Sequence, residues 1–492
     1  STMRKWTLYD ASMDGLRPEG NRQPAVALLL AALFSLTGPS FVSAQLFSLL
    51  AGLFCLFMCW LWARRVFGKL PALFTLLILS VSPLFVWYST QPDSLLLFTG
   101  VFFAVLTVAD RGKMDFGRAA VLGLMCALAY LVRTQGLILA FSIGVWILVK
   151  GGKKRIVKLL VFSAVFLVAC APWFVRNVRS FGSPTYTQGS QFLLNENHWS
   201  AWEVRNTPPE PMDMLRHRGP AAVLTYTVKG IFRVLEPITT GSLHRSEVFG
   251  QPSLAAFALL GLLALRKKCI RRKMLLPLVA AVPPLLALVL HEHSSRYLAF
   301  FSVIAVGLGS AGLVSFVKLT GGKAAAAAPL LLLTVFVPSL AGPLSESSME
   351  RAAEAEETAL WLKENSRPED WVVTFPAVEL LIWKYRRPTL TMPNDYQMLL
   401  WPCLEEHGVR FVVVDRYLPV MRPRLSDRWL WDQVQGEWRV EKPPEFLKEV
   451  YRSSSGATIV YEMTEDVPEG FMQVDSLPRD NLRALPPSGR AW

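Results

Sequence analysis

The chain has 492 residues, of which 52% are hydrophobic and only 18% charged, and its mean hydropathy is +0.34. This composition is too apolar for an ordinary soluble protein and favours a membrane protein with several spans. The formal net charge of +13 does not indicate a nucleic-acid-binding protein, because the basic residues lie in short loops between apolar segments. At this length there is room for two or three domains.

Apolar segments follow one another through the first two thirds of the chain. A helix needs about 20 residues to cross a hydrocarbon core of roughly 30 Å. The predicted spans are 41–63, 70–87, 94–109, 119–132, 136–149, 156–175, 253–265, 274–290, 297–317 and 324–341. The shorter segment Pro24–Thr37 is predicted to be a re-entrant or interfacial helix. Several of these segments are short, so we expect about 10–11 spans in a polytopic α-helical membrane protein.

Basic residues predict the orientation of these spans. They gather in every second loop: at Arg64, Arg65 and Lys69, at Arg111, Lys113 and Arg118, in 150–158, in 266–273, and at Lys318 and Lys323. Loops that face the cytoplasm carry an excess of Lys and Arg, so this set is predicted to be cytoplasmic. The opposite loops, including 176–252 and everything after residue 341, are then predicted to lie on the exported side.

The composition changes after residue 341, where segments of helical and strand type begin to alternate. Residues 345–365 have the pattern of a helix, and 371–375, 410–415 and 458–463 have that of short strands. We expect an exported α/β domain over 342–492 with a flexible tail after Val467. The remaining domains are then an exported N-terminal loop segment, 1–23, and a transmembrane catalytic domain, 24–341, that includes the exported loop 176–252.

Two nucleotide-binding motifs are excluded. GLGSAG, residues 307–312, matches the dinucleotide pattern, but it lies inside an apolar span with no strand before it. Its small residues are predicted to let two helices pack closely. The chain has no Asp-x-Asp pair, so it lacks a candidate for the usual metal and nucleotide-sugar site.

Ionisable residues at the exported ends of the spans form the candidate site. These residues are Asp93, Arg133, Arg176, Arg296 and Tyr297. Charged groups near the membrane core are costly and usually serve a pathway or a site. Guanidinium groups suit the geometry of phosphate, so three arginines beside one carboxylate predict an anion-binding site. The alternative is that each arginine only extends its charged end toward the membrane surface.

Five segments in a fixed order carry a resemblance to a known family. They are NRQPAVALLLAALFSLTG (21–38), WARRVFGKLPALFTLLILSVSPLFVWYSTQPDSLLLF (62–98), GLMCALAYLVRTQG (123–136), APWFVRNVRSFGSP (171–184) and SSRYLAFF (294–301). Over residues 21–316 the chain resembles the GT-C superfamily of membrane glycosyltransferases. The most similar branch contains the lipid A aminoarabinose transferases and the protein O-mannosyltransferases, and the C-terminal domain resembles the exported domains of such enzymes.

The resemblance implies that a sugar moves from a polyprenyl-phosphate-linked donor to an acceptor on the exported side. The acceptor is a lipid, a glycan or a protein, and the enzyme lies in the bacterial inner membrane with its C-terminal domain in the periplasm. Asp93 matches the acid of the family's second exported loop. Arg133 matches the basic residue that closes a later L-x-K/R stretch, and Arg296 with Tyr297 matches an RY pair. With Arg176, these basic groups are expected to bind the donor phosphate.

Two other functions remain open. A lipid-linked glycan polymerase or ligase also uses exported arginines, and a flippase acts on the same class of lipid. A flippase needs a polar path across the spans, whereas the polar groups of this chain lie at span ends. The large C-terminal α/β domain favours the glycosyltransferase.

The N-terminus departs from the family pattern, which has a first helix and then a loop with an acid shortly before a tyrosine. Tyr9 matches that tyrosine, but Lys5 stands about where the acid is expected. Either Asp10 or Asp14 replaces the acid as a catalytic residue beside Asp93, or the first helix and its acid are absent from this chain.

Further polar residues on the exported side are candidates for binding an acceptor or a metal. They are Glu196, His198 and His293. Their spacing is not a recognised zinc pattern, and acceptor recognition or a plain surface role is favoured. A divalent metal ion is kept as an open cofactor hypothesis, because a metal-bound carboxylate can orient an acceptor.

Overall fold

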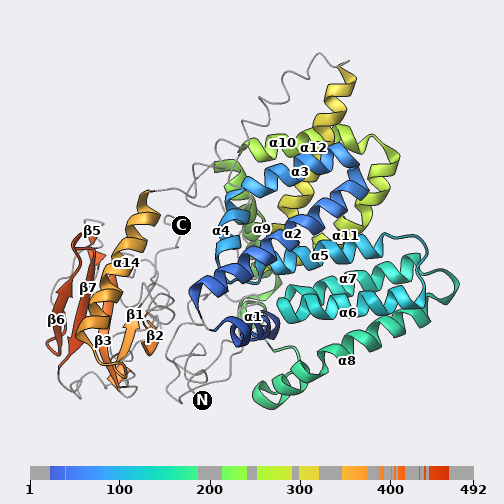
Figure 1. The fold of residues 1–492 in the computed structure, drawn as a ribbon. Coiled ribbons are helices and arrows are strands. Elements are labelled where there is room, and N and C mark those ends of the chain that lie inside the picture. The colour runs from blue at the N-terminus through green and yellow to red at the C-terminus, as the bar shows by residue number, and fades with distance from the viewer. Residues whose placement is uncertain are drawn as a thin grey trace. The chain divides into compact units, whose positions relative to one another are not determined.

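The computed structural model describes residues 23–38, 40–186, 213–240, 252–290, 299–320 and 346–374, with 385, 387–392, 401, 404–405, 408–415, 431–432, 437–438 and 443–464. Two units are distinguished (Figure 1), and we describe each by itself. The first is helical, and its described residues belong to 20–344. The second is built on a sheet, and its described residues belong to 345–492.

Helices of the first unit coincide with the predicted apolar segments. They are α1 (Pro24–Thr37), α2 (Phe41–Phe67), α3 (Lys69–Val81), α4 (Pro83–Thr90), α5 (Leu95–Ala109), α6 (Phe116–Val132), α7 (Gln135–Lys150), α8 (Arg155–Phe181), α10 (Pro252–Leu265), α11 (Lys268–Leu290) and α12 (Ala299–Leu319), with a short 3₁₀ helix, η2 (Gly152–Lys154). The predicted span 324–341 lies outside the described residues. The prediction of a mostly helical unit with many apolar helices is confirmed.

The predicted span 70–87 is broken into two helices. α3 and α4 meet at an angle of 58°. Pro83 disfavours helical backbone at the residue before it, and Ser82 is extended, with φ −63° and ψ 129°. The predicted span is therefore a bent pair of helices that together have the length and apolar character of a span.

Helix length separates full spans from shorter segments. Among the described helices, 42–67, 152–181 and 299–319 are each long and apolar enough to cross a membrane, and the α3–α4 pair makes a fourth if it is one span. α5, α6 and α7 have 15, 17 and 16 residues. These helices are shorter than the roughly 20 residues that a full crossing needs, so the total of 10–11 spans stays a prediction.

One helix was not predicted. α9 (Asp213–Thr240) lies within the segment 176–252, which the sequence analysis treated only as an exported loop. Gly219 interrupts it with a φ of 75°, and Pro220 follows. Charged residues are scattered along it, so it has no apolar run that would reveal it in the sequence.

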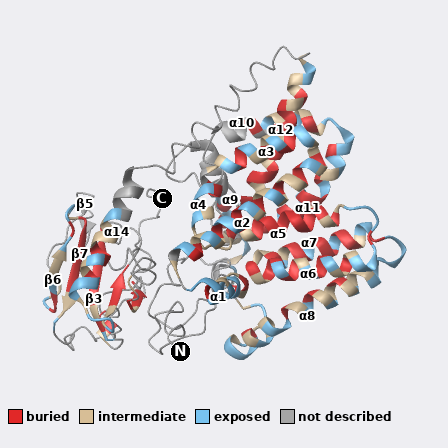
Figure 2. Ribbon diagram, in the orientation of Figure 1, coloured by how far each residue is buried: buried red, intermediate tan, exposed pale blue. Residues whose placement is uncertain are grey.

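α5 lies at the centre of the helical unit. Nearly all its residues are buried (Figure 2), as expected of a helix that is apolar on every side. Aromatic rings pack against it from other helices: the ring centroid of Phe103 lies 4.8 Å from that of Trp62, and Phe102 stacks on Phe300 at 4.9 Å. The middle of α5 is therefore held by a packed core.

The small residues of GLGSAG serve close packing between helices. A Cβ atom on Gly312 would overlap the carbonyl of Leu260 in α10, and one on Gly309 would lie 2.5 Å from the ring of Phe257. No side chain larger than hydrogen fits at these contacts without displacing α10. The prediction that this motif packs helices is confirmed.

The second unit is a mixed sheet with a helix, α14 (Glu346–Asn365). Its strands are β1 (Trp371–Thr374), β2 (Thr389–Thr391), β3 (Val409–Asp415), β6 (Leu447–Arg452) and β7 (Thr458–Met463), in the order β2-β1-β3-β7-β6; β4 (Trp431–Asp432) and β5 (Glu437–Trp438) form a separate ladder. β1 pairs in parallel with β2 and β3, and β7 is antiparallel to both β3 and β6. The predicted α/β character is confirmed.

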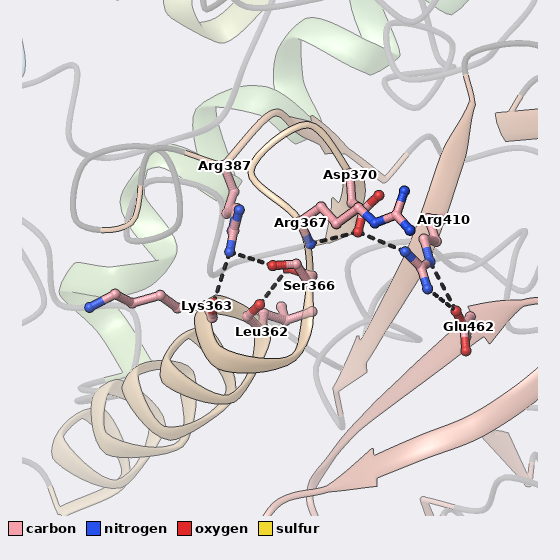
Figure 3. A network of polar contacts seen from close by, with 8 residues as sticks. All are labelled: Leu362, Lys363, Ser366, Arg367, Asp370, Arg387, Arg410 and Glu462. Atoms are coloured by element: carbon pink, nitrogen blue, oxygen red, sulfur yellow. Dashed lines mark hydrogen bonds and ion pairs between the residues drawn. The ribbon is translucent and has the colours of Figure 1, made fainter.

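A network of polar contacts closes the C-terminal end of α14 (Figure 3). The guanidinium of Arg387, only 5% exposed, donates to the carbonyls of Lys363 at 2.9 Å and Ser366 at 2.7 Å. The last carbonyls of a helix lack partners within the helix and attract positive charge. Arg410 pairs with Asp370 at 2.9 Å and with Glu462 at 2.8 Å. These arginines join the helix end and the turn after it to the sheet.

A carboxylate on the same helix predicts a pH dependence. The hydroxyl of Tyr451 donates to Glu357 Oε1 at 2.6 Å, and Ser454 donates to it through its backbone N–H at 2.9 Å. The Tyr451 hydrogen bond is the largest cause that lowers the pKa of Glu357. Because the pKa of Glu357 is lower in the folded protein than in the unfolded chain, where it is about 4.3, the ionised carboxylate stabilises the fold at a pH above that value. This stabilisation is lost as the pH falls through the pKa of the folded state.

We therefore expect hydrogen exchange in β6 and β7 to quicken as the pH falls below about 4.3. Glu357 is partly exposed, so water screens the interaction, and the expected change in the free energy of unfolding is less than about 1 kcal/mol. The exchange rates are corrected for the intrinsic pH dependence of amide hydrogen exchange. In Glu357→Gln, the corrected rates in β6 and β7 should lose most of their dependence on pH. Identical profiles in the wild type and the variant would contradict the prediction.

Candidate functional site

The carboxylate of Asp93 lies at the start of α5. Pro92 disfavours helical backbone at Gln91, so α4 ends at Thr90 and the chain turns. Asp93 Oδ1 accepts the backbone N–H of Leu95 at 2.7 Å. An acidic side chain at a helix N-terminus satisfies an unpaired donor and opposes the positive end of the helix dipole. The local sequence thus fixes where this carboxylate stands.

Arg133 lies in the turn between α6 and α7. Its backbone is extended, and its N–H caps α6 by donating to the carbonyl of Ala129 at 2.9 Å. The turn is tight, because a Cβ atom on Gly136 would overlap the backbone of Tyr130. The guanidinium leaves this turn toward the start of α5.

Asp93 and Arg133, 40 residues apart in sequence, form an ion pair. Arg133 Nη1 lies 3.1 Å from Asp93 Oδ1 and donates to Ser94 Oγ at 2.9 Å. The Asp93 side chain is 41% exposed and that of Arg133 only 15%. Both residues were predicted to lie on one side of the membrane, but neither their ion pair nor the contact with Ser94 was predicted. The neighbouring Ser94 was the only signal, since a hydroxyl beside an acid suits an arginine.

Arg176 is held differently, near the end of α8. Its guanidinium carbon lies 4.6 Å from the ring centroid of Trp173 and 5.0 Å from that of Phe181, which are cation–π distances. It donates to Asn177 Oδ1 at 2.9 Å, and the buried Asn177 donates to the carbonyl of Pro184 at 3.2 Å. These contacts explain the PWFVRN and FGSP motifs: they fold the chain after α8 back on the helix and hold the arginine between two rings.

The other predicted site residues lie outside the described residues. They are Asp10, Asp14, Glu196, His198, His293, Arg296 and Tyr297. Within the described residues, no group of three or more His, Cys, Asp or Glu side chains could hold a metal ion. The three candidate metal residues, Glu196, His198 and His293, lie outside the described residues, so the metal hypothesis stays a prediction.

One sequence family matches the chain. Residues 19–175 match the model described as dolichyl-phosphate-mannose-protein mannosyltransferase. This segment contains Asp93 and Arg133 and ends just before Arg176. No curated protein sequence matches the chain significantly.

Solved structures resemble the chain over most of its length. ArnT from Cupriavidus metallidurans, bound to undecaprenyl phosphate, matches with a TM-score of 0.52 and 15% identity, over 90% of this chain and 87% of that one. The archaeal oligosaccharyltransferase AglB from Archaeoglobus fulgidus, in complex with an inhibitory peptide and a dolichol-phosphate, matches with a TM-score of 0.51 and 13% identity, over 95% of this chain and 71% of that one. At these identities the likeness establishes the fold.

Proposed function

We propose that this chain, a membrane glycosyltransferase of the GT-C superfamily, moves a sugar from a polyprenyl-phosphate-linked donor to an acceptor on the exported side of the membrane. The observation that carries the proposal is the Asp93–Arg133 ion pair at the start of α5. It places a cation suited to phosphate beside an acid suited to orienting a hydroxyl or an amine.

Arg133 is assigned to the phosphate. In the transfer, a lone pair of the acceptor forms a bond to the anomeric carbon, the bond from that carbon to the phosphate oxygen breaks, and its electrons stay on the phosphate. Negative charge thus develops on the leaving phosphate, where a preorganised cation is most effective. The contacts with Asp93 and Ser94 hold Nη1 of the guanidinium in place before the donor arrives.

Asp93 is assigned to the acceptor. Its hydrogen bonds with Leu95 and Arg133 both use Oδ1. Oδ2 is then the atom that takes a hydrogen bond from the acceptor hydroxyl or amine and receives its proton as the new bond forms. The partial exposure of this side chain suits a group that meets a second substrate.

Arg176, Arg296 and Tyr297 are proposed to complete the binding of the donor phosphate. Asp10 or Asp14 stays a candidate for a second acid. A polymerase or ligase of lipid-linked glycans would use the same cation, and the chemical nature of the product separates it from a transferase. Against a flippase, α5 is buried and apolar along its length and offers no polar path beside the site.

Binding of undecaprenyl phosphate tests the proposal. Native mass spectrometry of the detergent-purified protein should show at least tenfold tighter binding of undecaprenyl phosphate than of undecaprenol, which has the same tail without the phosphate. A hydrogen bond to a charged group contributes about 1.5–3 kcal/mol, which corresponds to a tenfold change or more. Equal affinities would refute a phosphate site.

The orientation in the membrane is a second proposal, supported by the alternation of basic loops. Lys153 and Arg271 are expected in the cytoplasm and residues from 342 onward outside. Single cysteines at 153, 271 and 342 can be labelled in intact cells with a membrane-impermeant maleimide, in a background without Cys269 and Cys403. Labelling is expected at 342 alone. Labelling of 153 and 271 with protection of 342 would overturn both the orientation and the exported site.

A further inference from the structure

Three buried polar atoms, on residues two or three positions from Arg133 or Arg176 in the sequence, have no hydrogen-bond partner among the described residues. They are Tyr130 Oη, Gln135 Oε1 and Trp173 Nε1. Tyr130 as a whole is only 1% exposed. Buried polar groups without partners are rare, because removing them from water is costly unless a new hydrogen bond replaces the lost one. A cluster of three therefore needs an explanation.

These residues flank the two arginines of the site. In the sequence, Tyr130 precedes Arg133 by three residues and Gln135 follows it by two, and the ring of Trp173 contacts the guanidinium of Arg176. The ring centroid of Tyr130 lies 5.6 Å from that of Phe174, the neighbour of Trp173 in α8. Tyr130 lies in the last turn of α6, Gln135 is the first residue of α7, and Trp173 lies in the C-terminal part of α8. These three helices pack on one another (Figure 1).

The hydrogen-bonding properties of these three side chains indicate the kind of ligand that they can bind. The indole N–H of Trp173 only donates, so its partner must accept a hydrogen bond. The amide oxygen of Gln135 only accepts, so its partner must donate one. An ionised phosphate accepts but carries no proton to donate, whereas a sugar hydroxyl does both. The phenol of Tyr130 pairs with either kind of group.

Two unpartnered serine hydroxyls in α12 do not make such a site. Ser302 and Ser310 in α12 are also without partners. A helical serine can rotate its hydroxyl onto the carbonyl four residues earlier, as Ser315 does with Ala311 at 2.8 Å. The indole of Trp173 and the phenol of Tyr130 cannot find a partner by such a rotation.

We propose that Tyr130, Gln135 and Trp173 bind the hydroxyl groups of the donor's sugar. This inference rests on the proposed function and deepens it: the arginines bind the phosphate, and these three residues distinguish a sugar-bearing donor from bare polyprenyl phosphate. Once the sugar has left, these hydrogen bonds are lost and the lipid phosphate is held less tightly, which favours its release.

The experiment compares the affinity for undecaprenyl phosphate with that for undecaprenyl-phosphate-glucose and undecaprenyl-phosphate-mannose, in the purified full-length protein. The wild type should bind at least one sugar-bearing lipid about tenfold tighter than bare undecaprenyl phosphate. Tyr130→Phe, which removes only the hydroxyl, and Trp173→Phe, which replaces the indole by a smaller aromatic ring without an N–H, should each reduce this ratio at least threefold. Their affinity for undecaprenyl phosphate should stay within twofold of the wild type. Ser310→Ala, which removes an unpartnered hydroxyl elsewhere, should leave the ratio unchanged.

The outcomes separate this inference from the proposed function. A wild type that does not bind undecaprenyl phosphate contradicts the proposed function. A wild type that binds it, but binds neither sugar-bearing lipid more tightly, overturns the sugar site alone. The inference also fails if Tyr130→Phe lowers the melting temperature and reduces the affinity for all three lipids equally, because the hydroxyl then stabilises the folded protein. An unchanged or raised melting temperature together with a reduced ratio supports it.

Discussion

Replacing Arg133 with alanine is expected to weaken the binding of undecaprenyl phosphate at least tenfold and to abolish most turnover. A charge-assisted hydrogen bond contributes about 1.5–3 kcal/mol. Moreover, the change leaves the Asp93 carboxylate without its counter-ion, so that it repels an incoming phosphate. Both effects weaken the binding of the same ligand.

Two further variants sharpen this prediction. Arg133→Lys keeps the charge but loses the planar fork that suits phosphate, so it should bind with intermediate affinity. Arg179→Ala removes an exposed cation from the last turn of α8 and is expected to bind the lipid as the wild type does. Affinity in Arg133→Ala equal to that of the wild type would show that this arginine serves only to anchor its helix end at the membrane surface.

Replacing Asp93 with asparagine is expected to lower turnover at least a hundredfold while the protein stays folded. General-base contributions are typically about 10²–10⁴-fold in rate. Asparagine can still accept the N–H of Leu95, so the start of α5 is preserved. The affinity for undecaprenyl phosphate should stay the same or rise, because a carboxylate repels phosphate.

Asp115→Asn is the matched control for Asp93→Asn. Asp115 Oδ1 accepts the backbone N–H of Arg118 at 2.7 Å at the start of α6, as Asp93 Oδ1 accepts that of Leu95 at the start of α5. Each variant thus removes a charge that accepts a backbone N–H at a helix start, and only Asp93 belongs to the site. Near-normal turnover in Asp93→Asn would end its assignment as a catalytic residue and transfer that role to Asp10 or Asp14.

The double variant Asp93→Asn/Arg133→Ala separates two roles for the carboxylate. If Asp93 only positions Arg133, turnover in the double variant equals that in Arg133→Ala. If Asp93 also acts on the acceptor, turnover in the double variant is lower than in Arg133→Ala. The ion pair at 3.1 Å supports a positioning role, and the additional loss in the double variant measures the role toward the acceptor.

The sequence predicted those elements whose pattern depends on local residues. The unbroken apolar run of α5 predicted a buried helix, and β1, β3 and β7 were visible as apolar runs in the middle of a sheet. β2 has three residues, and β6, at the sheet edge, is exposed at several of its positions. Because β2 and β6 depend on pairing with distant segments and carry no local sequence pattern, they were not predicted.

The candidate site was predicted in composition but not in geometry. Helix ends and loop charges placed Asp93 and Arg133 on one side of the membrane. Their contact depends on how α5 and α6 pack, and no local pattern encodes that packing. The stacking of Arg176 on Trp173 was closer to prediction, since these residues are three apart on one helix and therefore neighbours on its surface.

The most direct test of the account is sugar transfer itself. Purified protein is incubated with undecaprenyl-phosphate-linked sugars carrying a radioactive label and with a membrane extract, and the labelled products are separated into lipid, glycan and protein fractions. The account predicts that the wild type moves label from the donor into one of these fractions, that Asp115→Asn does so at a similar rate, and that Asp93→Asn does so at least a hundredfold more slowly. Label that stays on a bound donor in the wild type, or equal transfer by Asp93→Asn, would contradict it.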